Sequence, residues 1–356
     1  MKECVYTALP QRLKKRITIL FQTPKKHACM HASVIVVTYN RAELLKKCIN
    51  SLSNQTVSPD EIVIVDNNST DNTKEVVDNY KGKLNIKYVF ESKKGIAYAR
   101  NSGIRNSSYD LVVFIDDDCV AEKDWLESMI KYNILHEDIP VIGGDIPPVL
   151  TNNAYSDVSY YFWKTWVHDF TVRHLQTKRM KWLTGYFENC DFGEKTVETL
   201  SLSTSNISFK RNVLGENLVF DARMPPCEDE ELNYRLHSLG YKKYFIPRIK
   251  VKHLYRTSLK SFLIQQFNFG RGHFKVRKKW KNIPSLLPDN LPNAFLFAIA
   301  PFIIPIRLFL NYSLLKSIKY SPIVFLREVL FRLGVLYEMS YQFSKKEESS
   351  TEDANV

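Results

Sequence analysis

Between residues 33 and 146 the chain alternates short apolar runs with longer amphipathic segments, and this alternation restricts the fold more than any other feature. Runs such as SVIVVT and EIVIVD are rich in β-branched residues, as buried strands are. Strands that alternate with helices form a mostly parallel sheet covered on both faces. We therefore predict a Rossmann-like α/β fold. The predicted strands are residues 33–38, 61–66, 84–90, 111–115 and 141–145, and the predicted helices are residues 41–55, 70–81, 95–106 and 125–136.

The remainder of the chain is less regular. Residues 155–187 are rich in aromatic side chains that could stack on sugar rings or simply pack against one another. Further on, the pattern predicts strands at 204–210, 243–246 and 249–254, and helices at 229–239, 258–280 and 322–344. The resulting organisation is a basic N-terminal arm (1–31), an α/β domain (32–255), a basic and apolar helical extension (256–344) and a disordered tail (345–356).

Positive charge is concentrated in one segment. The net charge of the chain is +12, yet residues 232–288 contain 14 basic and no acidic residues. Such a surplus indicates an anionic partner, and its basic side chains are candidates for phosphate contacts, with a solvated basic face as the alternative. The candidates include Arg271, Lys275, Arg277, Lys278 and Lys279.

Polar residues follow the predicted strands, at the edge of the sheet where ligands bind in such folds. They include Thr38–Arg41, Asp66–Asp71 and Asp116–Asp118. The first predicted strand is followed by neither a G-x-G-x-x-G nor a G-x-x-x-x-G-K-[ST] motif. A dinucleotide-dependent oxidoreductase and a P-loop enzyme are therefore disfavoured.

Two acidic clusters carry the strongest chemical signal. Asp116-Asp117-Asp118 places three carboxylates side by side, which favours a bound Mg²⁺ or Mn²⁺, although an acidic turn before a helix would give the same pattern. The segment Cys227–Glu231 contains four consecutive carboxylates at a predicted helix start. They either stabilise the helix dipole or include a general base for a hydroxyl nucleophile.

The motifs SVIVVTYNRAELLKKCINSL, EIVIVDNNSTDNT, GIAYARNSGI, LVVFIDDDC, STSNISFKR and CEDEELNYRLHSLGY occur in one order between residue 33 and about residue 255. In this order and spacing the chain resembles the family-2 inverting glycosyltransferases of the GT-A fold. The resemblance implies a nucleotide-diphosphate sugar donor and Mn²⁺ or Mg²⁺ as cofactor. It implies transfer of a hexose-type sugar to a hydroxyl of a glycan or lipid-linked acceptor, in cell-envelope polysaccharide or glycolipid synthesis.

The resemblance also assigns residues to the donor. It implies that the nucleotide sugar contacts Thr38, Tyr39, Asn40, Arg41, Asp66, Asn67, Arg100, Asp116, Asp117 and Asn206. We expect a uridine donor. At one position this chain departs from the family's pattern, because many family members have a second Asp where this chain has Asn67. Arg100 could instead pair with an acidic strand end, and Asn206 could instead hold a turn.

The metal and the base are assigned in the same way. Asp116 and Asp118 match the outer carboxylates of the D-x-D motif, and His253 is a candidate third metal ligand or a structural histidine. Asp229 matches the catalytic base, with Glu228 beside it. Asp229 is then expected to take the acceptor's proton in a single inverting displacement.

Residues 294–306 form a run without a polar side chain. A membrane-spanning helix needs about 20 apolar residues, and Pro301 and Pro305 would kink one. We expect an interfacial or re-entrant element on an anionic membrane surface; a full span and a buried core hairpin are the alternatives. The expected location is cytoplasmic, peripheral or monotopic on the cytoplasmic face of the cell membrane.

Two other functions are alternatives to glycosyl transfer. A nucleotidyltransferase would share the nucleotide-binding half, but TYNRAE after the first strand is not the glycine-rich, lysine-containing loop it needs. A nucleic-acid-binding protein would use the basic segment for phosphates, but the acidic clusters would repel nucleic acid. We therefore expect no nucleic-acid partner.

Overall fold

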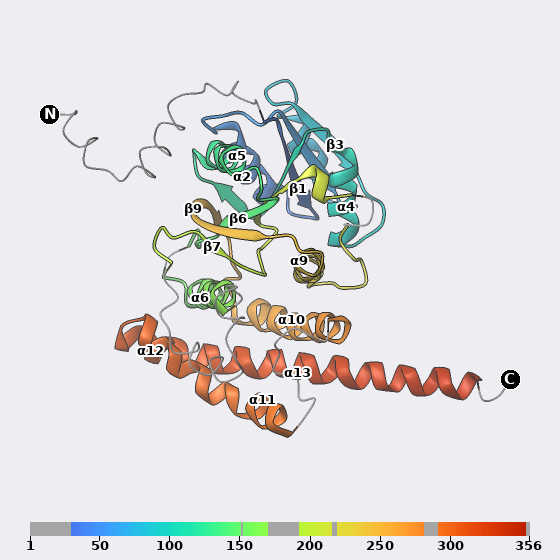
Figure 1. Cartoon of the computed structure of the whole chain (residues 1–356), viewed down its shortest axis with the longest axis vertical. Coiled ribbons are helices and arrows are strands. Elements are labelled where there is room, and N and C mark those ends of the chain that lie inside the picture. The colour runs from blue at the N-terminus through green and yellow to red at the C-terminus, as the bar shows by residue number, and fades with distance from the viewer. Residues whose placement is uncertain (1–29, 151, 170–191, 216–218, 281–290, 354–356) are drawn as a thin grey trace, which may run out of the picture. The chain divides into compact units, whose positions relative to one another are not determined.

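The computed structural model describes residues 30–150, 152–169, 192–215, 219–280 and 291–353. Most of the predicted N-terminal arm, and Trp182 and Tyr186 of the aromatic segment, lie outside the described residues. The described strands form a nine-stranded mixed sheet in the order β3-β2-β1-β4-β8-β6-β9-β5, with β7 paired to β9 (Figure 1). The strands are β1 Ala32–Thr38, β2 Glu61–Asp66, β3 Ile86–Phe90, β4 Leu111–Asp116, β5 Cys119–Ala121, β6 Val141–Asp145, β7 Val197–Glu198, β8 Asn206–Lys210 and β9 Lys243–His253.

The first four strands confirm the predicted parallel sheet. Strands β2, β1 and β4 are parallel neighbours, with Thr38 opposite Asp66 and Val37 opposite Asp116. Their carboxyl ends therefore lie at one edge of the sheet, and the polar residues that follow them come together there. Ile35, Val63 and Val112 are fully buried beneath this edge.

Three helices connect these strands and a fourth leads from β5 to β6, all close to where they were predicted. They are α2 Ala42–Ser53, α3 Thr73–Asp78, α4 Ile96–Asn106 and α5 Trp125–Leu135. Asp71 binds the first N–H group of two of these helices. Its Oδ2 accepts from the Ala42 N–H of α2 (3.0 Å), and its Oδ1 accepts from the Thr73 N–H of α3 (3.2 Å). The helix that we expected to continue to residue 81 ends at Asp78.

The second half of the sheet differs from prediction at three strands, because β5 and β7 were not predicted and β9 was predicted as two strands. Residues 243–246 and 249–254 were expected to form two strands, but β9 is continuous from Lys243 to His253 and its register against β6 shifts after Gly144. Strand β8 runs antiparallel between β4 and β6, which makes the sheet mixed. Strand β5 pairs with the end of β9 and places Cys119 opposite His253.

The C-terminal part is a layer of helices. Together with α6 Ala154–Asp169 it contains α9 Glu228–Ser238, α10 Leu259–Lys279, α11 Leu291–Ile303, the short 3₁₀ helix η2 Ile304–Arg307, α12 Leu308–Asn311 and α13 Leu314–Asp353 (Figure 1). The 3₁₀ helix η1 Arg211–Val213 instead follows β8 directly and adds Val213 to the core of the sheet. The apolar segment is partly core, since Ala300, Ile304 and Leu308 pack with Phe262 and Tyr161. No helix among the described residues has the length and apolar character needed to cross a membrane. The tail predicted to be disordered continues α13 as far as Asp353.

Candidate active site

The end of β1 is held by the middle residue of the first acidic cluster. Asp117 is 3% exposed; its Oδ2 accepts from the Thr38 hydroxyl (2.8 Å) and its Oδ1 from Arg41 Nη1 (3.0 Å). Burial raises the pKa of Asp117 to about 7, against the opposing effect of Arg41. Arg41 Nη1 also donates to Asp118 Oδ2 (3.0 Å). Thr38, Arg41 and Asp117, all predicted to contact the donor, are thus engaged with one another.

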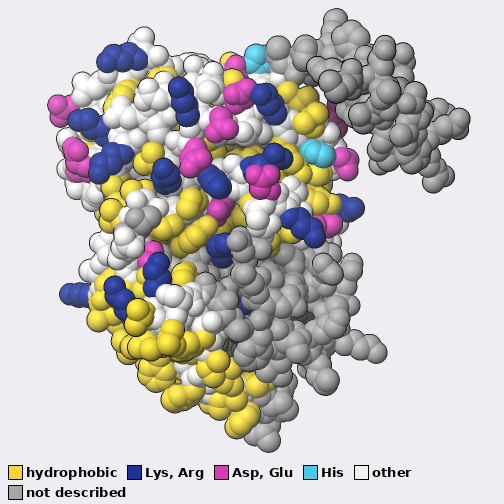
Figure 2. Space-filling model, turned by 90° about the vertical axis from the view of Figure 1, so that its left-hand side faces the viewer, with side chains coloured by type: hydrophobic (Ala, Val, Ile, Leu, Met, Phe, Trp, Pro, Cys, Tyr) yellow, Lys and Arg dark blue, Asp and Glu magenta, His cyan; other side chains and the backbone are white. Residues whose placement is uncertain are grey.

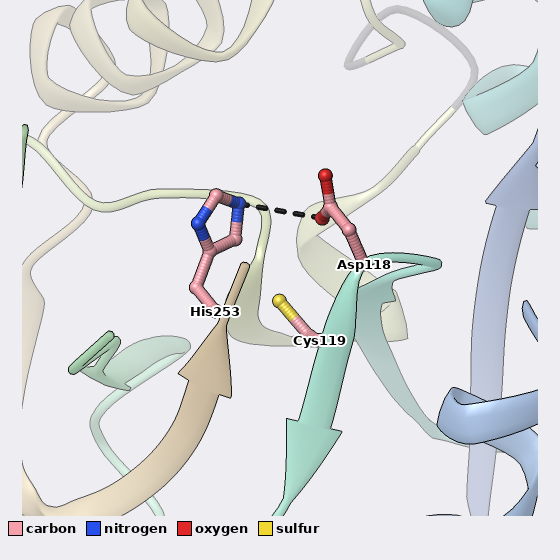
Figure 3. Close-up of side chains that lie close together, drawn as sticks. All are labelled: Asp118, Cys119 and His253. Carbon is pink, nitrogen blue, oxygen red and sulfur yellow. Dashed lines mark ion pairs between the residues drawn. The ribbon is translucent and has the colours of Figure 1, made fainter. Parts of the chain in front are cut away.

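Asp118, Cys119 and His253 form a compact cluster where β5 meets the end of β9 (Figure 3). One donor atom from each lies within 4.8 Å of the other two, and His253 Nε2 is 3.3 Å from Asp118 Oδ1. Burial alone would raise the pKa of Asp118, but His253 and Arg41 outweigh it and bring this pKa to about 2. Burial alone would lower the pKa of His253, but the neighbouring Asp118 outweighs it, so the pKa of His253 is raised.

This cluster suits a divalent cation. His253 Nδ1 is buried and has no hydrogen-bond partner among the described residues. A carboxylate and an imidazole are ligands that Mn²⁺ accepts, and a cation could replace the histidine proton as the charge facing Asp118. Cys119 is a poor ligand by comparison, because burial raises its pKa well above the usual value and keeps it a thiol. Sequence reasoning had not considered Cys119.

Asp116 lies outside this three-residue cluster. Its Oδ2 accepts from the Ser205 hydroxyl (2.6 Å), and its Oδ1 is 3.4 Å from Arg100 Nη2. Ser205 was missed as a site residue, although it belongs to the STSNISFK motif that carries the resemblance. A metal role for Asp116 remains a prediction.

Arg100 joins the two acidic clusters, although 128 residues separate it from Glu228. Its guanidinium is 4% exposed and pairs with Glu228 through Nη1 and with Asp116 through Nη2. Its ion pair with Asp116 matches the alternative weighed for it from sequence. Glu228 is 2% exposed and held by this pair, which favours a supporting role over the catalytic one predicted for it.

Asp229 is the half-buried member of the second cluster. Its Oδ1 accepts from the Glu230 N–H (2.8 Å) in the first turn of α9. Burial, with the charge of Glu228 next, raises the pKa of Asp229 to about 7, while Arg100 acts in the opposite direction. A carboxylate with such a pKa is suited to accept a proton near neutral pH.

The end of β2 is organised by its own side chains. Asp66 accepts from the Tyr88 hydroxyl (2.7 Å) and from the Ser69 N–H (2.8 Å). Asn67 donates to the Lys93 carbonyl (2.7 Å) and accepts from the Gly95 N–H (2.7 Å), so it fixes the loop before α4.

Two exposed residues follow β1 on the same edge. The Oδ1 of Asn40 accepts from the Thr70 N–H (2.7 Å), which links the ends of β1 and β2. The ring of Tyr39 is 43% exposed and has Lys94 Nζ 5.3 Å from its centroid. Of the residues predicted to hold the nucleoside, Tyr39 and Asn40 are exposed, and Tyr39 offers an aromatic ring.

Asn206 is not placed as expected. Its Nδ2 donates to the carbonyls of Asp145 and Ile249 (2.9 Å each), and its Oδ1 accepts from Trp125 Nε1 (2.9 Å). Both of its N–H groups are used inside the protein and it is 1% exposed. The structure therefore corrects the predicted donor contact to a structural role, which was the alternative considered.

The basic segment is also reassigned. Arg271 pairs with Glu338 of α13 (3.0 Å), and Lys279 pairs with Glu231 of α9 (2.7 Å). Arg277 is 4% exposed and lies 3.6 Å from Glu230. The expected phosphate contacts of these side chains are replaced by ion pairs within the protein.

The fold has a counterpart among solved structures. A mannosyltransferase of Pyrobaculum calidifontis, determined with GDP-mannose and Mn²⁺, matches with a TM-score of 0.59 and 16% identity, covering 94% of this chain and 96% of that one. The fold is that of the GT-A glycosyltransferases.

Sequence comparison identifies the family. The model described as "Glycosyl transferase family 2" matches residues 33–184. Glycosyltransferase AglE of Haloferax volcanii is 36% identical over 248 residues, 68% of this chain and 73% of that protein. The chain therefore belongs to glycosyl transferase family 2 and is a transferase enzyme.

Other relatives share shorter or more distant segments. A Methanococcus voltae enzyme named as a dolichyl N-acetyl-α-D-glucosaminyl phosphate glucuronosyltransferase is 27% identical over 283 residues, 76% of this chain and 81% of that protein. A validoxylamine A glucosyltransferase of Streptomyces hygroscopicus is 40% identical over 102 residues, 28% of this chain; the match spans only 22% of that enzyme.

Proposed function

We propose that the protein is a metal-dependent inverting glycosyltransferase that moves a sugar from a nucleotide-diphosphate donor to a hydroxyl of a lipid-linked or glycan acceptor. The observation that carries this proposal is Arg100, which draws the Asp116 and Glu228 clusters to one edge of the sheet. Paired acidic groups of different character, one suited to a cation and one to a proton, are what such a displacement requires.

Asp118 and His253 would hold Mn²⁺ or Mg²⁺, with Asp116 as a further candidate ligand. When bound, the metal would neutralise the charge that grows on the departing diphosphate. Arg41 adds a fixed positive charge next to Asp118, and Asp117 anchors both Arg41 and Thr38. The exposed ring of Tyr39 would stack on the nucleoside.

Asp229 would take the proton of the acceptor hydroxyl as its oxygen attacks the anomeric carbon. Glu228 and Arg100 support this role, because Glu228 raises the pKa of Asp229 and Arg100 limits the rise. The bond to the diphosphate breaks as the new glycosidic bond forms, so one step inverts the configuration.

The donor is proposed to be a UDP-sugar, with a GDP-sugar as the second choice. The departure at Asn67 leaves the base open, and the Pyrobaculum neighbour was determined with GDP-mannose. The acceptor is proposed to be lipid-linked, in cell-envelope polysaccharide or glycolipid synthesis, since the Methanococcus relative is named for a dolichyl-linked acceptor.

We further propose that the C-terminal helices rest on the cytoplasmic face of the cell membrane. Figure 2 shows hydrophobic side chains gathered at the lower end of the described part, where Figure 1 places α11, α12 and α13. Residues 290–327 contain no carboxylate, and Lys316 and Lys319 are exposed there, which complements an anionic lipid surface. This exposed apolar surface consists of Phe295, Phe302, Ile306, Phe309, Leu314, Leu315 and Ile318.

A panel of UDP- and GDP-sugars, screened by thermal unfolding with and without MnCl₂, tests the proposal. One nucleotide sugar should raise the Tm in MnCl₂ and have little effect in EDTA, because only the native state binds it. Asp118→Asn should abolish this metal-dependent rise. Asp124→Asn, which changes an exposed carboxylate outside the cluster, should keep it. An equal Tm rise in EDTA would contradict the metal dependence.

A further inference from the structure

The first turn of α9 is held from two sides. On one side Glu228 pairs with Arg100. On the other side Glu230, the residue after the proposed base, is 5% exposed and faces the C-terminal half of α10. Asp229 therefore stands between two carboxylates, each fixed by a cationic or hydrogen-bonding partner from a different helix.

The contact with α10 is a closed polar network. Glu230 Oε1 lies 3.1 Å from the Tyr234 hydroxyl, 3.3 Å from His273 Nδ1 and 3.6 Å from Arg277 Nη2. Arg277 Nη2 donates to the Tyr234 hydroxyl (2.7 Å), and Arg277 Nε donates to His273 Nε2 (3.3 Å). These polar contacts run between α9 and α10 or within one of these two helices.

These contacts fix the protonation state of His273. An arginine nitrogen can only donate, so Nε2 accepts and the ring proton is on Nδ1, directed at Glu230. Burial lowers the pKa of His273, in agreement with a neutral ring. The network thus has one anion, one cation and two neutral groups, a balance suited to a buried position.

The backbone packing leaves the two helices little room to move. A Cβ on Gly272 would come within 2.6 Å of Cys227 Sγ, at the residue that precedes α9. On the opposite side of α10, a Cβ on Gly270 would lie 1.9 Å from the Phe331 carbonyl oxygen of α13. Helix α10 is therefore fixed between α9 and α13.

We propose that His273, with Glu230, Tyr234 and Arg277, is a positioning residue for the first turn of α9, which carries Asp229. This proposal rests on the proposed role of Asp229 as the base. These side chains do not touch the substrate in this scheme. They set the place and direction of Asp229 by fixing the turn on which it stands. Loss of the network should lower kcat and leave the donor KM unchanged, because the donor site is formed by β1, β2 and β4.

The experiment compares two substitutions of His273 in the full chain, with nucleoside diphosphate release from the sugar nucleotide selected by the panel as the readout. His273→Phe keeps a ring and removes both polar contacts; we expect kcat to fall about tenfold. His273→Asn keeps an N–H near the Nδ1 position and should restore most of the activity. Arg271→Gln is the control on the same helix as His273. It breaks the ion pair between α10 and Glu338 of α13 and should leave kcat unchanged.

A double-mutant cycle with Asp229→Asn separates positioning from general destabilisation. If His273 acts through Asp229, His273→Phe should not lower the residual kcat in the Asp229→Asn background. An equal fall in both backgrounds would overturn the positioning role and leave the proposed base intact. Full turnover of Asp229→Asn alone would overturn the base, and the positioning role with it. If His273→Phe does not fold, Tyr234→Phe removes only the hydroxyl and serves the same comparison.

Discussion

At the residue scale, the site is organised by side chains that hold other side chains. Thr38 and Arg41 both bind Asp117, and Arg100 binds both Asp116 and Glu228. The carboxylates with direct chemical roles in the proposal, Asp118 and Asp229, are flanked by these fixed groups. Substitution of a flanking residue should therefore affect the reaction through the geometry of its neighbour.

Asp229→Asn should lower kcat by about 10²–10⁴-fold, because the amide cannot accept the acceptor's proton. The KM for the nucleotide sugar should change little, since Asp229 lies outside the strand ends that are proposed to bind the donor. Steady-state release of nucleoside diphosphate measures both constants. Asp78→Asn is a suitable control, because Asp78 is an exposed carboxylate at the end of α3 and pairs with Lys81. Retained kcat in Asp229→Asn would exclude this residue as the base.

The pH dependence of kcat should report the titration of Asp229. Burial and then Glu228 raise the pKa of Asp229 from 3.8 to about 7, so its protonated, inactive form dominates below that pH. We expect kcat to fall about tenfold per pH unit below this pKa and to level off above it. The residual activity of Asp229→Asn should lack this limb. A wild-type profile that is flat from about pH 5.5 to about pH 8.5 would contradict a base with this pKa.

The sequence located the motif residues but not their partners. The family resemblance assigned Asp118 and His253 to one metal site, and His253 Nε2 lies 3.3 Å from Asp118 Oδ1, while their binding of a metal stays a prediction. Asn206 was assigned to the donor, yet it holds Asp145, Ile249 and Trp125 together. The role of Asn206 depends on which backbone groups lie next to its side chain in the folded protein. The periodicity of apolar residues along the sequence contains no such information.

At the element scale, strands and helices were predicted where periodicity and end signals agree. The error at β9 has a local cause: Pro247 and Arg248 interrupt the pattern, but a register shift beside Gly144 absorbs them within one strand. Tertiary pairing with β6 and β5 thus decided what the local sequence left open.

The crossing of α10 and α13 depends on two glycines that sequence reasoning did not pair. A Cβ on Gly270 would lie 1.9 Å from the Phe331 carbonyl oxygen, and one on Gly334 would lie 2.0 Å from the Phe267 carbonyl oxygen. Gly334→Ala should lower the free energy of unfolding by about 1–3 kcal/mol, because the backbones must separate. Thermal or urea unfolding measures this loss. Gly215→Ala, with open space at its Cβ, should be near neutral, and equal effects at the two sites would refute the close crossing.

At the scale of the whole molecule, the net charge of +12 has a different meaning from the one first inferred. Arg271, Arg277 and Lys279 of the basic segment pair with carboxylates on α9 and α13, which the sequence places before and after it. The exposed apolar surface, with Lys316 and Lys319 nearby, becomes the better candidate for an anionic membrane. A count along the chain could not show this, because ion pairs form in space.

Membrane binding should depend on that surface. Phe302 and Leu315 are 68% and 82% exposed. Replacing both with Ser should weaken sedimentation with phosphatidylglycerol-containing liposomes by at least about tenfold, because each buried side chain contributes about 1.5–3 kcal/mol. Leu135→Ser changes a side chain on α5 that is 73% exposed and should bind as the wild type does. Equal binding of all variants would exclude this surface as the contact.

The packing of α10 against α9 also limits which fragments of the protein can fold. Residue 255, the predicted end of the α/β domain, is not a place at which the chain can be cut. A fragment that stops there would expose Cys227 and Tyr234, which pack against Val276, and would leave the buried Glu230 without His273 and Arg277. The helical extension is therefore part of the folding unit that presents Asp229.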